Sequence, residues 1–252
     1  NKKLSKTDAM KKNLVVAHRG GSLLAPENTM AAFRQALELG VDRIELDVQQ
    51  SNDGMVLVMH DEKINRTTNG KGVISELNYA QLKDVDAGSK FSKEFSNEKI
   101  PLLDEVLHLV NGQCELLVEI KNPGNINQGL EKNVANLIQQ HQALAWCIVQ
   151  SFEYESLYRL HKINDQITLG LLLDKPKTDT LKKSAANTSF ISEININRRS
   201  ASAAMIDLIH QMNKKVFVWT VNKPGEMARL IKNGADGIIT DDPKTLKALL
   251  YG

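Results

Sequence analysis

Short apolar runs alternate along the chain with longer segments in which apolar residues recur at a helical period. The short runs predict strands at 14–17, 43–48, 115–120, 148–150, 168–171, 190–193, 216–219 and 237–240. The longer segments predict helices that follow these strands, near 29–40, 102–110, 126–141, 153–163, 177–186, 201–212 and 224–233, with one more at the end of the chain. Such alternation predicts parallel strands with helices outside them.

The predicted units are eight in number, which fits a closed α/β barrel, the (β/α)8 or TIM barrel. This fold typically takes about 250 residues, and the chain has 252. An open, doubly wound sheet gives a similar pattern and stays an alternative. The predicted organisation is therefore one barrel domain at 14–252, after a polar N-terminal segment at 1–13.

The first helix carries clear signals at both ends. Asn28 or Thr29 can serve as its N-cap, because both side chains accept hydrogen bonds from the backbone N–H groups of a first turn. Gly40 is typical of the residue that follows the last turn of a helix.

One segment departs from the alternation. Residues 55–59 predict an extra strand after the turn signal Asn52-Asp53-Gly54. The stretch 61–99 is then mostly polar, holds glycines at 70, 72 and 88, and shows little periodicity. Plain loops of this length are uncommon between core elements. We therefore expect a small inserted lobe at 61–99, after the second strand.

Composition narrows the class of protein. Hydrophobic residues make up 42%, charged residues 25%, and the formal net charge is +2, which gives no electrostatic signature of a nucleic-acid partner. No apolar run approaches the ~18 residues of a membrane span, and no signal peptide is visible, so we expect no stable membrane insertion and a cytoplasmic location. Cys114 and Cys147 lie in apolar runs and are expected to be buried thiols.

Ionisable residues gather where the predicted strands end. In TIM barrels, reactive groups lie at the C-terminal ends of the strands. The residues found there are His18 and Arg19, Glu45 and Asp47, His60 and Asp61, Glu119 and Lys121, and Trp219. The pattern predicts a reactive rim at this end of the barrel.

Glu45 and Asp47 are two residues apart on one strand, so their side chains point to the same face. Buried, unpaired carboxylates are costly. One divalent cation, Mg²⁺ or Ca²⁺, would neutralise them, because both ions prefer oxygen ligands, and Glu119 could supply a third. The alternative is that Arg43 or Lys121 pairs with these carboxylates.

His18 and His60 end apolar strands at the same rim. A single histidine at such a place is more often structural, but two beside an acidic cluster favour catalysis. Phosphodiester cleavage needs one group to take a proton and another to give one, and histidine does both near neutral pH. Arg19 and Lys121 could bind phosphate oxygens.

Two aromatic residues have two interpretations each. Trp219 ends the strand at 216–219, and Phe152 lies just beyond the strand at 148–150. Both are either core residues or walls of a substrate pocket, against the apolar part of an alcohol.

Several short motifs occur together and in order. They are His-Arg-Gly at 18–20, Pro-Glu-Asn-Thr at 26–29, Glu-Leu-Asp-Val at 45–48, His-Asp at 60–61, Glu-Ile-Lys at 119–121, Val-Trp-Thr-Val-Asn at 218–222 and the closing segment at 236–243. From about residue 14 to the C-terminus, this set resembles the glycerophosphodiester phosphodiesterase family. The resemblance implies a TIM barrel with a small insertion, and hydrolysis of deacylated phospholipids to sn-glycerol 3-phosphate and an alcohol.

The resemblance also implies roles for individual residues. Those matching metal ligands are Glu45, Asp47 and Glu119, and those matching the general acid–base pair are His18 and His60. Arg19 and Lys121 match phosphate contacts, Trp219 an aromatic wall, and Glu27, Asn28 and Asp61 supporting positions.

Several alternatives stay open. A related enzyme could act like a phospholipase D on lysophospholipids, which requires an apolar groove for the acyl chain. A non-enzymatic phosphodiester sensor should lack a histidine or a metal-binding carboxylate, and none is missing here. Within the preferred reaction, the nucleophile is either the substrate's neighbouring glycerol hydroxyl or water. The sequence does not choose the head group, the ion, the role of each histidine, or between a monomer and a homodimer.

Overall fold

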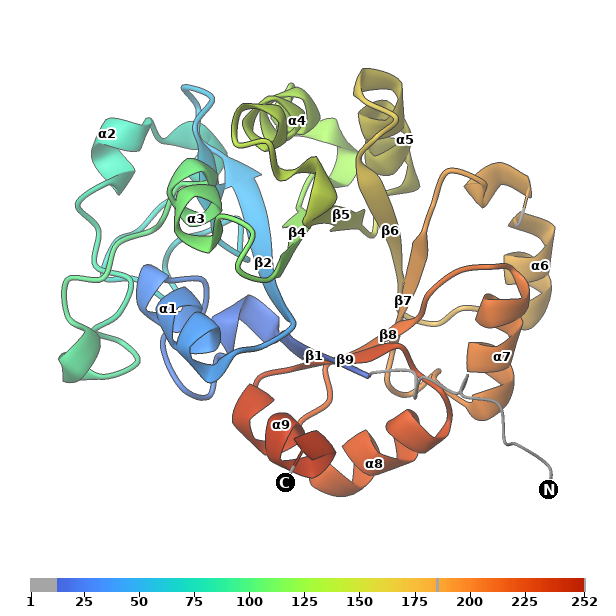
Figure 1. The fold of residues 1–252 in the computed structure, drawn as a ribbon. Coiled ribbons are helices and arrows are strands. Elements are labelled where there is room, and N and C mark those ends of the chain that lie inside the picture. The colour runs from blue at the N-terminus through green and yellow to red at the C-terminus, as the bar shows by residue number, and fades with distance from the viewer. Residues whose placement is uncertain (1–12, 185, 252) are drawn as a thin grey trace, which may run out of the picture.

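Eight parallel strands form a closed ring with helices outside it (Figure 1). The computed structural model describes residues 13–184 and 186–251, so nearly all of the predicted segment 1–13 lies outside the described residues. The ring runs β1-β9-β8-β7-β6-β5-β4-β2, and pairing of β1 with β2 closes it. Its strands are β1 Leu14–Ala17, β2 Arg43–Gln50, β4 Glu115–Ile120, β5 Cys147–Ser151, β6 Thr168–Leu173, β7 Glu193–Asn197, β8 Phe217–Trp219 and β9 Gly237–Thr240. The TIM-barrel prediction is confirmed over the open sheet.

The helices follow the strands as expected. They are α1 Met30–Leu39, α2 Tyr79–Leu82, α3 Leu103–Val110, α4 Leu130–Gln140, α5 Tyr154–Ile163, α6 Thr178–Ser184, α7 Ala203–Gln211, α8 Pro224–Lys232 and α9 Pro243–Tyr251. Of the two N-cap candidates for α1, Thr29 is the cap: its side chain accepts a hydrogen bond from the Ala32 N–H. Gly40 ends the helix with φ +66°, a conformation that favours glycine.

The strand expected at 190–193 was misplaced. The structure places β7 at Glu193–Asn197, so the predicted run overlaps the strand by one residue. The strand alternates between isoleucines, which pack outward in the main core, and polar side chains at 193 and 195, which make buried hydrogen bonds. A search for apolar runs misses such a strand, because every second residue in it is polar.

The hydrophobic core has two parts. The larger part lies between the strands and the surrounding helices. The smaller part forms a cluster of buried residues contributed by five strands: Val16, Leu117, Ile148, Phe217 and Ile239. These residues come from two stretches of the ring that face each other across it, β8-β9-β1 and β4-β5. The cluster therefore lies inside the barrel, and the ionisable side chains on the inner face lie at either end of the strands.

A buried ion pair lies at the N-terminal end of the barrel. The Arg43 guanidinium donates to Glu193, with Nη1 2.9 Å from Oε2 and Nη2 3.0 Å from Oε1. Its Nε is also 2.9 Å from Glu115 Oε2, and its guanidinium carbon lies 4.2 Å from the centre of the Phe217 ring. Arg43 is 1% exposed, so its charge depends on these partners.

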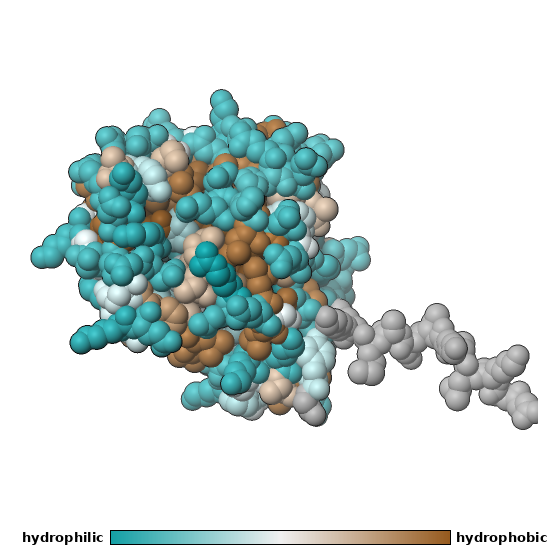
Figure 2. Space-filling view, turned by 60° about the vertical axis from the view of Figure 1, so that its left-hand side comes forward, coloured by the Kyte–Doolittle hydropathy of each residue, from teal (hydrophilic) through white to brown (hydrophobic). Residues whose placement is uncertain are grey.

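The segment after β2 forms a separate small core. Strand β3, Val56–Val58, runs antiparallel to β2, and the chain up to α3 then carries only the short helix α2 and single turns of 3-10 helix. Its buried residues are Leu57, Met59, Ile64, Ile74, Leu82, Ala87 and Ile100. Figure 2 brings this side of the molecule forward, and its surface is largely hydrophilic. The exact domain bounds of 14–252 and 61–99 stay predictions.

Two further expectations concern the cysteines and membrane insertion. Cys147 is buried, whereas Cys114 is only partly so. Over the described residues, every helix is too short or too polar to span a membrane.

Replacement of Arg43 by alanine should destabilise the fold. Removing one partner of a buried ion pair leaves an uncompensated charge, here Glu193, at a cost of about 3–5 kcal/mol. Urea unfolding should show this as a lower midpoint at an unchanged slope. The double variant Arg43→Met with Glu193→Gln should recover part of the loss, and an Arg43→Ala loss below about 1 kcal/mol would contradict the interpretation.

Candidate active site

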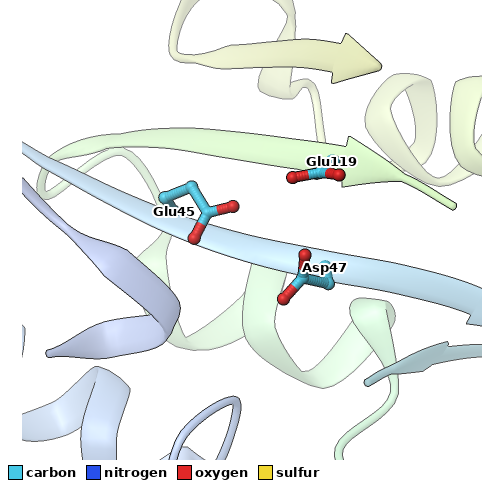
Figure 3. Close-up of side chains that lie close together, drawn as sticks. All are labelled: Glu45, Asp47 and Glu119. Atoms are coloured by element: carbon cyan, nitrogen blue, oxygen red, sulfur yellow. The ribbon is translucent and has the colours of Figure 1, made fainter. Parts of the chain in front are cut away.

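Three buried carboxylates meet at the C-terminal end of β2 and β4. Asp47 and Glu119 are register partners on these neighbouring strands, and Glu45 lies two residues earlier on β2. One oxygen from each of the three lies within 4.8 Å of the others. Figure 3 shows the side chains converging on a shared space between the two strands. The predicted acidic cluster is therefore present in space.

The carboxylates perturb each other. Burial, followed by the negative charges of Asp47 and Glu45, raises the pKa of Glu119 to about 8. Burial and Asp47 also raise the pKa of Glu45. Burial acts in the same direction on Asp47, but the cations Lys121 and Arg19 outweigh it and lower its pKa to about 2. The cluster therefore carries negative charge that the neighbouring cations Lys121 and Arg19 neutralise only in part.

The cluster fits a divalent cation. Asp47 Oδ1 is buried and makes no hydrogen bond, although the Lys121 ammonium lies 3.2 Å away. Lys121 also contacts Glu119, so the predicted alternative of pairing with a cation is realised in part by Lys121, whereas Arg43 pairs elsewhere. A buried oxygen without a hydrogen bond, among three converging carboxylates, suits Mg²⁺ or Ca²⁺.

His18 follows β1 and lies beside this cluster. Its Nε2 is 4.0 Å from Glu45 Oε2, and its Nδ1 is 2.5 Å from Asp241 Oδ1. Asp241 also accepts hydrogen bonds from the Ser22 hydroxyl and the Asn222 amide, both at 2.6 Å. Burial would lower the pKa of His18, but Glu45 and the bond to Asp241 raise it above the ordinary value. The carboxylate on Nδ1 leaves Nε2 facing the acidic cluster.

His60 follows β3 and has a carboxylate partner of its own. Its Nδ1 is 2.7 Å from Asp61 Oδ1, and the Arg66 guanidinium holds the pKa of Asp61 well below its usual range. Burial lowers the pKa of His60, although Asp47 opposes this effect. The two histidines therefore share one design, a carboxylate on Nδ1, but differ in the group that holds that carboxylate.

Arg19 adopts a left-handed backbone conformation, with φ +52°, which is uncommon outside glycine. This conformation directs its N–H to Glu45 Oε2 at 2.9 Å. The next residue, Gly20, has φ +86°, and a Cβ there would lie 2.7 Å from the Ala32 Cβ. The His-Arg-Gly motif thus allows the chain to turn tightly between the metal-binding candidates and α1.

The supporting residues also reach the site. The Asn28 amide donates to Asp47 Oδ2 at 2.9 Å, and Glu27 Oε1 accepts from Arg19 Nη1 at 2.9 Å. Arg19 Nε lies 3.3 Å from Asp47 Oδ2. Two of the predicted supporting residues therefore orient groups that contact or approach the carboxylates.

Several of the side chains described above line a cavity of about 200 Å³ at the barrel mouth. Its walls include both histidines, Arg19, Lys121, Glu45 and Glu119, together with the apolar side chains Phe152, Leu172, Trp219 and Ile239. The Phe152 and Trp219 rings meet edge to face with centres 5.5 Å apart. Both aromatic residues are wall residues here, although the Trp219 indole also donates to the Asn195 carbonyl at 3.1 Å.

Sequence reasoning missed three groups in this neighbourhood. They are Asp241 with its partners, Arg66, and a chain in which Asn195 donates to Gln150 at 2.9 Å and Gln150 reaches Glu45 at 3.5 Å. The run Thr240-Asp241-Asp242-Pro243 signalled a motif, but nothing in the sequence pairs it with His18. Arg66 and Gln150 gave no signal of their own.

The structure is thus a (β/α)8 barrel whose mouth holds histidines and carboxylates, the groups of acid–base and metal-assisted chemistry. Similarity to known proteins then identifies the family. The model of the glycerophosphoryl diester phosphodiesterase family matches residues 18–245, so the chain belongs to this family of phosphoric diester hydrolases. The resemblance inferred from the motifs is confirmed.

The sequences of several relatives align with this chain over almost its whole length. A glycerophosphodiester phosphodiesterase of Caldanaerobacter subterraneus is 39% identical, covering 93% of this chain and 96% of its own. One from Bacillus altitudinis is 36% identical, covering 91% and 94%. Among solved structures, an Oleispira antarctica phosphodiesterase in complex with the product sn-glycerol-3-phosphate is 26% identical, covers 95% of this chain and 97% of its own, and superposes with a TM-score of 0.85.

Replacing Glu119 by glutamine should weaken binding of Mg²⁺ or Ca²⁺. Even outer partners of a metal site commonly contribute about 10–100-fold in affinity, and loss of a direct ligand should cost no less. Isothermal titration calorimetry measures this directly. Glu62→Gln, at an exposed position in the 61–99 segment, is the matched control, and equal affinities for the two variants would remove Glu119 from the ligand set.

Proposed function

We propose that this protein hydrolyses glycerophosphodiesters to sn-glycerol 3-phosphate and an alcohol, by general acid–base catalysis with His18 and His60 and with one divalent cation. The observation that carries the proposal is the cavity that both imidazoles share with Glu45 and Glu119, two members of the three-carboxylate cluster. The named relatives and the product complex of the Oleispira antarctica enzyme support the choice of substrate class.

The two histidines divide the proton transfers. One imidazole takes the proton of the attacking hydroxyl, while the other donates a proton to the departing alkoxide as its bond to phosphorus breaks. In one route the attacking group is the neighbouring glycerol hydroxyl, which leaves a cyclic phosphate that water opens; in the other, water attacks phosphorus directly. Asp241 and Asp61 hold the rings through Nδ1, so Nε2 is the nitrogen that exchanges protons in both cases.

Glu45, Asp47 and Glu119 would hold the cation. Bound there, Mg²⁺ or Ca²⁺ would supply Lewis-acid stabilisation of charge on the phosphoryl oxygens. Arg19 and Lys121 line the same cavity, and their donors suit the phosphate oxygens. Phe152 and Trp219 would contact the apolar carbons of glycerol or of the leaving alcohol.

A coupled assay for glycerol 3-phosphate tests the reaction. Glycerophosphocholine should be turned over, activity should disappear in EDTA, and Mg²⁺ or Ca²⁺ should restore it. Activity that survives complete chelation would contradict the cation requirement. Lysophosphatidylcholine assayed in parallel distinguishes the alternative, because only a lysophospholipase-D-like enzyme should prefer it.

His18→Ala and His60→Ala should each lower kcat by about 10²–10⁴-fold, the usual contribution of a general acid or base. His108, exposed on α3, gives the matched control His108→Ala, which should keep full activity. Steady-state kinetics with circular dichroism separates loss of chemistry from loss of fold. Near-normal turnover in either active-site variant would remove that histidine from the mechanism.

The cyclic-phosphate route is open to a separate test. Single-turnover quenching followed by ³¹P NMR should reveal a cyclic glycerol phosphate in the His variant that opens it more slowly, or in the wild type at early times. Formation of glycerol 3-phosphate in a single step, without any such species, would instead indicate direct attack by water.

A further inference from the structure

Arg66 lies outside the cavity but holds two of the carboxylates around it. The residue belongs to the segment 61–99. Its Nε and Nη2 donate to Asp61 at 2.6 and 3.0 Å, and its Nη1 and Nη2 donate to Glu27 at 2.9 and 2.8 Å. One guanidinium thus makes two bidentate contacts, which are the strongest and most directional form of this pairing.

Each of these carboxylates holds a residue of the cavity wall. Asp61 Oδ1 is 2.7 Å from His60 Nδ1, and Glu27 Oε1 accepts from Arg19 Nη1 at 2.9 Å. His60 and Arg19 approach the cavity from different segments, one after β3 and one after β1. Arg66 is the group on which the two chains of contacts meet.

We propose that Arg66 is a positioning residue for the reaction, which sets the orientation of the His60 imidazole through Asp61 and that of the Arg19 guanidinium through Glu27. The inference rests on the proposed function, because it assigns Arg66 its effect through a general acid–base histidine and a phosphate-binding arginine. It gives the segment 61–99 a part in catalysis although its Arg66 side chain does not line the cavity.

Exposure separates this role from a structural one. The Arg66 side chain is 48% exposed, so water screens its charge and lowers what these ion pairs contribute to stability, below the contribution of a buried pair. Orientation is a different quantity. Without the guanidinium, Asp61 and Glu27 lose a shared cation, and each carboxylate becomes free to rotate away from the group that it holds.

Lysine cannot replace this arginine. An ammonium is a point charge without the planar fork that binds two carboxylates edge to edge. Arg66→Lys should therefore keep the charge balance of the site but lose part of the alignment, whereas Arg66→Met should lose both.

Steady-state kinetics of the metal-loaded full chain with glycerophosphocholine tests the proposal. Arg66→Met should lower kcat/KM about 10–100-fold, the usual cost of losing a partner that orients a functional group, and Arg66→Lys should fall between it and the wild type. Arg229, on α8 and 49% exposed beside Glu226, supplies the matched control. Arg229→Met should keep wild-type kinetics, and all three variants should melt close to the wild type.

Variants of Asp61 and Glu27 test the two chains of contacts separately. Asp61→Asn should act mainly on kcat, since it acts through His60, and Glu27→Gln mainly on KM, since Arg19 contacts the substrate before and during the reaction. Combining either change with Arg66→Met should cost less than the product of the single effects, because the residues act in one chain.

The outcomes are distinguishable. If His60→Ala is inactive while Arg66→Met has wild-type kcat and KM, the proposed function stands and the role of Arg66 is refuted. Additive effects of Arg66→Met with both Asp61→Asn and Glu27→Gln also refute it. A melting temperature of Arg66→Met far below that of Arg229→Met would assign Arg66 to the fold instead. If His60→Ala is fully active, His60 is removed from the mechanism and the effect of Arg66 through Asp61 is refuted with it. If the metal-loaded wild type does not turn over glycerophosphocholine, the proposed function itself is wrong.

Discussion

The repulsion among three carboxylates inside the barrel mouth is the constraint to which the surrounding groups respond. Glu45, Asp47 and Glu119 are all buried, and their mutual repulsion would oppose the folded barrel if nothing balanced it. Lys121 and Arg19 bring positive charge to them, and uncharged donors bind Glu45 and Asp47 Oδ2, whereas Asp47 Oδ1 makes no hydrogen bond. A cation would complete the balance, so the feature that is costly for stability is also the one that prepares the site for its chemistry.

Apolar side chains inside the barrel separate the three carboxylates from a second charged group, an ion pair. The Arg43–Glu193 pair occupies the opposite end of the strands, and the cluster around Leu117 and Phe217 lies inside the barrel as well. Low-polarity surroundings strengthen electrostatic interactions. The same surroundings make each ionisable side chain depend on a specific partner, which explains why so many hydrogen bonds in the structure end on a carboxylate.

The two histidines show how distant segments complete one site. His18 is held by Asp241, from the end of the chain, and Asp241 is bound by neutral donors, Ser22 and Asn222. His60 is held by its neighbour Asp61, which is bound by the charged Arg66. The pKa values of the two imidazoles shift in opposite directions for another reason: at His18 the effects of Glu45 and the bond to Asp241 outweigh burial, whereas at His60 burial, together with the cations Lys121 and Arg19, prevails.

Much of this protein was readable from local rules. Hydrophobic periodicity gave the barrel, since parallel strand–helix units have few ways to pack, and the two-residue spacing of Glu45 and Asp47 put both on one face. Periodicity misplaced β7, because polar side chains on its inner face make buried hydrogen bonds and interrupt the apolar run. What only the tertiary structure decided were the partners: Arg43 with Glu193, Asp241 with His18, and Arg66 with Glu27. A sequence specifies which face a side chain occupies, but the closing of the ring decides which distant charge it meets.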